Sequence, residues 1–115
     1  MDIFDIKNMK AYPPKERQKN VLYETEGFKV RVIDLPAEGQ MPPCLMESFV
    51  LFQVVSGSAE VTVDGKAAAI HEGQCLVTPT ATLSMRTATG VRMLGVQVGT
   101  KSPAPLDSKT PPGSS

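Results

Sequence analysis

The 115-residue sequence contains one histidine, two cysteines and no excess of either charge, and each shortage excludes a class of function. Lys plus Arg and Asp plus Glu both number 12, so we expect no basic patch for nucleic acid or an anionic membrane. No apolar run reaches the roughly 18 residues that a membrane-spanning helix needs. We therefore expect a soluble protein that binds neither nucleic acid nor membrane.

The N-terminus and the cysteines predict the compartment. The first residues, Met1 to Asp5, are acidic and too poor in apolar residues for a secretory signal. Two cysteines without an export signal favour a reducing compartment. Cys44 and Cys75 lack Cys-x-x-Cys spacing and an adjacent base, so we interpret them as buried free thiols rather than a redox pair. The sequence thus predicts a cytoplasmic protein.

The chain divides into three predicted zones. Residues 1–20 are polar and form an N-terminal extension or arm. Residues 21–98 hold nearly all of the apolar and β-branched content, enough for one domain with one core. Residues 99–115 are rich in proline and serine and contain no aromatic residue. Such a tail cannot bury enough apolar surface to offset its ordering entropy, so we predict that it is disordered.

The middle zone has the pattern of short strands separated by turns. Asp64-Gly65 suits a two-residue hairpin in which both central residues have positive φ. Turn signals at intervals of roughly 8–12 residues are typical of an all-β sandwich or barrel, and no segment of helical period is long enough for a core helix. The predicted strands cover residues 30–35, 49–55, 60–63, 66–70, 75–78, 83–87 and 91–98.

The segment from Phe49 to Val55 is apolar on both of its alternating faces. A strand with one face in water should alternate between apolar and polar residues. Something therefore covers the outer face, and we expect a second copy of the chain in a symmetric homodimer. Coverage by residues 1–20 is the alternative.

The order of these signals resembles the cupin family, in particular its small single-domain members, over about residues 21–98. The first cupin motif has a glycine, two histidines, a glutamate and a closing glycine; the second has a glycine, a proline, a glycine and a histidine. The resemblance implies a cupin-type double-stranded β-helix, or jelly-roll barrel, as a single all-β domain. In this sequence the two motifs fall on Gly39, Cys44, Met46, Val50 and Gly57, and on Gly73, Pro79, Ala81 and Ser84.

Most scaffold positions of the motifs survive, whereas all four ligand positions are substituted. Val50 cannot ligate a metal, and Ser84 is a poor ligand. Cys44 and Met46 share a face by strand alternation, and their sulfur atoms would suit only a soft ion such as Cu(I). We favour the interpretation that these pliant residues fill the space left by the family's ligands. The prediction is a protein without a metal or other cofactor.

Polar groups for a ligand are few. Arg86 is the leading candidate because it shares strand parity with Ser84, the position that in the family points into the barrel. An inward guanidinium would bind a carboxylate or phosphate through paired hydrogen bonds. Arg31 and Arg92 are expected on the surface. His71, the only histidine, is expected at an exposed turn, so we assign no catalytic residue.

The leading hypothesis is a metal-free module that binds or senses a small ligand, anionic if Arg86 takes part. An apolar lining with few polar groups suits binding better than catalysis. Two alternatives stay open. One is a cupin enzyme of the isomerase or oxygenase type with a soft-metal or metal-free site, and the other is a structural or partner-binding dimer with a closed pocket. The predicted pocket residues are Cys44, Met46, Val50, Phe52, Ser84 and Arg86.

Overall fold

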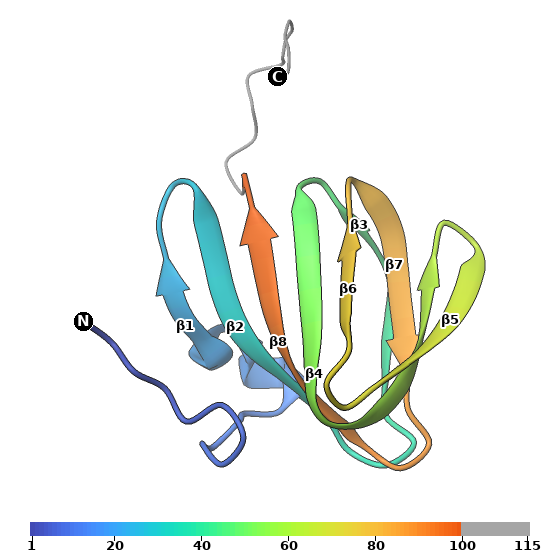
Figure 1. Ribbon diagram of the computed structural model, residues 1–115, viewed down its shortest axis with the longest axis horizontal. Helices are drawn as coiled ribbons and strands as arrows, with labels where there is room; N and C mark the ends of the chain where they lie inside the picture. The colour runs from blue at the N-terminus through green and yellow to red at the C-terminus, as the bar shows by residue number, and fades with distance from the viewer. Residues whose placement is uncertain (100–115) are drawn as a thin grey trace, which may run out of the picture.

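The computed structural model describes residues 1–99, and these form eight antiparallel strands that curl into an all-β barrel (Figure 1). The all-β prediction is confirmed. Residues 100–115, which make up nearly all of the predicted disordered tail, lie outside the described residues. The elements are η1 Pro14–Asn20, a 3-10 helix, then β1 Val21–Glu24, β2 Phe28–Leu35, β3 Gln40–Met46, β4 Phe49–Val63, β5 Lys66–His71, β6 Cys75–Thr78, β7 Ala81–Arg86 and β8 Val91–Val98.

The long strand β4 connects the two halves of the barrel. The strand order is β1-β2-β8-β4-β7-β3, and β5 and β6 also pair with β4. The first part of β4 pairs with β8 and β6, and its second part pairs with β7 and β5. Figure 1 shows β4 curving along the bottom of the view between these partners. The two predicted strands 49–55 and 60–63 are therefore one strand of 15 residues.

The bend in β4 has a local cause. Its pairing with β8 shifts register between Val54 and Ser56, and Gly57 follows with a φ of 83°. A bulge bends a strand, and a positive φ favours glycine. A Cβ atom at Gly57 would also collide with the carbonyl oxygen of Gly90. Glycine at this motif position is therefore required by the closure of the barrel, independently of any ligand.

The hairpin predicted at Asp64-Gly65 is confirmed. It joins β4 to β5, and its two central residues have φ values of 48° and 86°. The Thr82 N–H donates to Asp64 Oδ1 at 2.8 Å, and the Asp64 N–H donates to the Thr82 carbonyl at 2.9 Å. These bonds tie the turn to β7.

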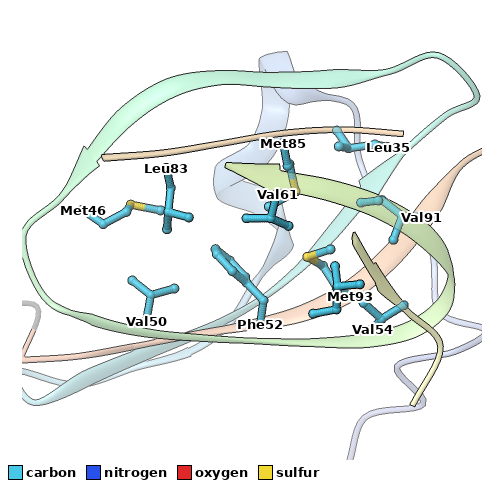
Figure 2. Close-up of a cluster of buried hydrophobic side chains, with 12 residues drawn as sticks. Leu35, Met46, Val50, Phe52, Val54, Val61, Leu83, Met85, Val91 and Met93 are labelled. Atoms are coloured by element: carbon cyan, nitrogen blue, oxygen red, sulfur yellow. The ribbon is translucent and has the colours of Figure 1, made fainter. Parts of the chain in front are cut away.

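The apolar core lies between the two halves of the barrel (Figure 2). Phe52, Val61, Leu83 and Met93 are essentially inaccessible to solvent. Burial of one such side chain stabilises the fold by about 1.5–3 kcal/mol. The core residues are Leu35, Met46, Val50, Phe52, Val54, Ala59, Val61, Ile70, Leu83, Met85, Val91 and Met93.

The N-terminal segment covers only part of the outer face of the sheet. Arg92 on β8 donates from Nε to Asp34 Oδ2 at 2.7 Å and from Nη1 to the carbonyls of Ile6 and Met9. Arg92 was expected on the surface, but this clamp leaves it partly buried. None of the helices in residues 1–99 is long and apolar enough to cross a membrane.

Candidate functional site

Three of the six predicted pocket residues belong to the core. Met46, Val50 and Phe52 are all buried. Met46 and Val50 point toward Leu83 at one end of the cluster in Figure 2. The positions where the resemblance places a histidine and the glutamate are thus filled by packed apolar side chains. Val50 and Phe52 stabilise the barrel rather than line an open pocket.

The inward orientation expected for Ser84 and Arg86 is wrong. On β7 the buried side chains are those of Leu83 and Met85, and Arg86 is 73% exposed. Its Nε and Nη2 both lie 2.9 Å from Glu60 Oε1. Successive side chains of a strand point to opposite faces. Because Leu83 and Met85 point into the core, Ser84 and Arg86 point outward. Arg86 is a surface ion-pair partner, with its charge already matched.

Cys44 lies on the interior side of β3 but remains exposed. The register pairs Cys44 with Leu83 and Met46 with Ala81, so Cys44 and Met46 share a face. Cys75 is exposed on β6, beside Gln53. Both thiols are free, but neither is buried as expected.

The donor set does not fit the metal of the cupin motifs. Of the four ligand positions, Val50 is packed in the core and Ser84 faces outward. The remaining two offer a buried thioether and an exposed thiol. Within residues 1–99, no three His, Cys, Asp or Glu side chains lie together as a metal site. His71 is exposed at the end of β5.

A pocket of about 580 Å³ lies between β2 and β3, which face each other without pairing. We call it the β2–β3 pocket. Its volume is within the range of about 300–1,000 Å³ that is typical of small-molecule sites. Cys44 and Met46 line it, whereas the other four predicted pocket residues do not. The lining residues are Tyr12, Arg17, Asn20, Lys29, Arg31, Val32, Ile33, Asp34, Leu35, Gln40, Met41, Pro42, Pro43, Cys44, Leu45, Met46 and Gln97.

Arg31 is the functional candidate that the sequence reasoning missed. The register with β8 places Arg31 opposite Gly95, on the interior face that also carries Ile33 and Leu35. Burial lowers the pKa of the Arg31 guanidinium, the like charge of Arg17 lowers it further, and Cys44 opposes both effects. A guanidinium nevertheless stays protonated at neutral pH.

The Arg31 side chain lacks a carboxylate partner. Among residues 1–99, the ion pairs of the sheet arginines join Arg86 to Glu60 and Arg92 to Asp34, and Arg31 forms no ion pair or hydrogen bond through its side chain. Desolvation of an unpaired charge is unfavourable. The pocket therefore contains a partly buried cation without a counter-charge.

Comparison with known proteins identifies the fold. An RmlC-like cupin from Desulfovibrio desulfuricans superposes with a TM-score of 0.72 at 19% identity, over 86% of this chain and 97% of that chain. The cupin domain of Cnp3 from Schizosaccharomyces pombe gives 0.64 at 20% identity, over 68% of this chain and 61% of that chain. A point mutant of salicylate 1,2-dioxygenase from Pseudoaminobacter salicylatoxidans, in complex with gentisate, gives 0.61 at 17% identity, over 65% of this chain and 21% of that chain.

These likenesses define a cupin fold, as the two sequence motifs implied. The chain spans less than two thirds of the length of the Cnp3 structure. No protein-family model and no curated protein matches the sequence. The fold is therefore established, and the function has to be argued from the site.

Proposed function

We propose that the chain is a cupin-fold binding protein that holds a small molecule in the β2–β3 pocket without a metal. The observation that carries this proposal is an accessible pocket of small-molecule size in a barrel that packs two of its four metal positions, Met46 and Val50, in the core. The site differs from the sequence prediction in its walls. Four of the six residues predicted to line the pocket lie elsewhere, and residues of β2 form part of the lining instead.

The chemistry of the lining favours binding over proton transfer. Ile33, Met41 and Met46 supply apolar surface, and Lys29 and Gln97 supply polar contacts from the interior faces of β2 and β8. A general acid or base works best with a pKa near the working pH, and histidine usually fills that role. The histidine of this chain lies outside the pocket. An apolar floor with a few polar groups is the common pattern of a ligand site.

Thermal-shift screening against a library of small acids, alcohols and amines tests the proposal. We expect at least one compound class to raise the Tm of the untagged protein, because a ligand that binds only the folded state stabilises it. Cys44→Phe should abolish the shift by filling the pocket. Cys75→Phe places the same bulk on β6 and should leave the shift intact. A library without any Cys44-dependent shift would contradict the proposal.

The soft-metal alternative makes a different prediction. Elemental analysis of the untagged protein would then find a stoichiometric transition metal that Cys44→Ala removes. We expect no such metal, because Cys44 and Met46 together supply only two donors and Met46 is buried.

We also propose that the chain forms a homodimer through an exposed row of apolar side chains on β4, β6 and β8. Phe49 and Val77 are 59% and 64% exposed. Phe49 pairs with Val98, and Leu51 pairs with both Val77 and Val96, so these apolar side chains form one continuous row. A self-complementary apolar patch suits a two-fold interface.

Sedimentation velocity at micromolar concentration tests the dimer. The wild-type protein should sediment as a dimer and Phe49→Asp as a monomer. Leu45→Asp is the matched control, because Leu45 is similarly exposed but lies on β3. A wild-type monomer would count against this interface.

A further inference from the structure

We infer that the ligand of the β2–β3 pocket is a small monocarboxylic acid with an apolar body, and that Arg31 binds its carboxylate. The inference rests on the proposed function and adds a ligand class and an anchoring residue. It replaces the sequence hypothesis that Arg86 is the anion anchor.

The position of Arg31 suits a ligand contact. It lies on the interior face of β2, in register with Gly95 on β8. A Cβ atom at Gly95 would approach Ile33 Cδ1 to 3.1 Å and Phe52 Cε1 to 3.3 Å, so a side chain there would crowd the interior. The glycine thus lets Ile33 and Phe52 pack closely against the backbone of β8 beside Arg31. Arg31 therefore extends into the pocket from a rigid sheet rather than from a loop.

The charge balance of the pocket favours an anionic ligand. Lys29 lies 3.8 Å from Glu24, and Asp34 is paired with Arg92. Arg17, another cation of the lining, adds a like charge that acts on Arg31. Arg31 itself has no acidic partner among residues 1–99. One unmatched guanidinium is complementary to one carboxylate, which it binds through two parallel charge-assisted hydrogen bonds.

The other end of the pocket is apolar. Ile33 and Leu35 follow Arg31 on the same face of β2, and Met41 and Met46 face them from β3. A ligand whose carboxylate meets Arg31 would place its body against these side chains. Methionine adapts its shape easily, so this surface accepts a flexible or branched apolar body. The combination favours an aliphatic acid over a sugar or a nucleotide.

Isothermal titration calorimetry with hexanoate and 1-hexanol tests the inference, because the two probes share a body and differ in the carboxylate. Hexanoate should bind the wild-type protein, and 1-hexanol should bind about tenfold to a hundredfold more weakly. Arg31→Gln should weaken hexanoate binding by a similar factor and leave 1-hexanol binding unchanged. Arg31→Lys keeps the charge without the planar fork and should give an intermediate affinity. Arg86→Gln is the matched arginine control and should bind hexanoate as the wild type does.

A second measurement reads occupancy at the pocket directly. Hexanoate should slow alkylation of Cys44 by N-ethylmaleimide, and Cys75 on the outer face of β6 is the internal reference. Arg31→Gln should lose this protection while keeping the wild-type alkylation rate at Cys75, which also shows that the variant is folded.

Three outcomes would overturn the inference. They are equal affinity for hexanoate and 1-hexanol, hexanoate binding that survives Arg31→Gln, and inorganic phosphate protecting Cys44 as well as hexanoate does. None of them bears on the proposed function, which fails only if the library contains no ligand whose thermal shift depends on Cys44.

Discussion

Two walls of the barrel interior, β4 with β7 and β2 with β3, carry different kinds of side chain. On β4 and β7 the interior residues are all apolar, among them Val50, Phe52, Leu83 and Met85, and they are sealed from solvent. On β2 and β3 the interior faces also carry Lys29, Arg31 and Cys44. The first wall belongs to strands paired to each other, whereas β2 and β3 face each other across a gap.

This difference teaches that the polar side chains of the barrel interior lie beside the β2–β3 pocket. Charged groups in a packed interior are unfavourable unless they are paired. An unpaired guanidinium is tolerable beside an accessible pocket because water or a ligand can solvate it. Substitutions on the β4–β7 wall should therefore change stability, and substitutions on the β2–β3 wall should change binding.

The largest expected effect is on the β4–β7 wall. Leu83→Ala should lower the free energy of unfolding by about 2–5 kcal/mol, because it removes a side chain that is 0% exposed and leaves a cavity. Leu45→Ala, at a side chain that is 58% exposed on the partner strand β3, should cost about 0.5 kcal/mol or less. Urea denaturation of both variants measures the contrast. A similar loss of unfolding free energy in the two variants would contradict the idea that the β4–β7 wall carries the stability of the fold.

An intermediate effect is expected where an arginine is held on the outer face. The Arg92 side chain is 15% exposed and contacts the N-terminal segment, so Arg92→Ala should cost about 1–3 kcal/mol. Arg86→Ala breaks an exposed pair and should cost about 1 kcal/mol or less. Chemical denaturation compares the two, and hydrogen exchange should show faster exchange near residues 6–9 only in Arg92→Ala. An equal response in both variants would show that the clamp contributes nothing.

The smallest stability change is expected inside the pocket. Gln97 lines it and pairs with core residue Val50, so Gln97→Leu extends the apolar wall and should change the free energy of unfolding by about 0.5 kcal/mol or less. The variant should nevertheless bind hexanoate more weakly, because it removes a polar contact near Arg31. Gln53→Leu, on the outer side of β4, is the control and should leave binding unchanged. A large loss of stability in Gln97→Leu would show that Gln97 stabilises the fold, contrary to the role in binding expected for it.

Much of the fold could be predicted because turns act locally. Asp64-Gly65 favours a tight hairpin through its own backbone preferences, and it does join two strands. The joining of two predicted strands into β4 could not be predicted in this way. Its bend at Gly57 depends on the close approach of Gly90, which is far away in sequence.

The site was harder to predict, for two different reasons. The sequence contained the signal for the outward direction of Arg86, since the apolar Leu83 and Met85 alternate with Ser84 and Arg86. The alignment with the second cupin motif instead placed Ser84, and with it Arg86, on the inward face. Arg31 gave no such signal. Its strand carries apolar residues on both faces, so alternation cannot distinguish a pocket arginine from a surface arginine. The homodimer and the cytoplasmic location stay predictions.

The packing of Val50 has a consequence for any attempt to build the metal motif into this barrel. A glutamate at that position, as the metal motif requires, would bury a carboxylate among the apolar side chains of Met46 and Leu83. A single substitution toward the metal motif should therefore weaken folding before a complete site could form. Substitutions that line the accessible β2–β3 pocket avoid this cost, so this barrel can gain a binding specificity more readily than a metal site.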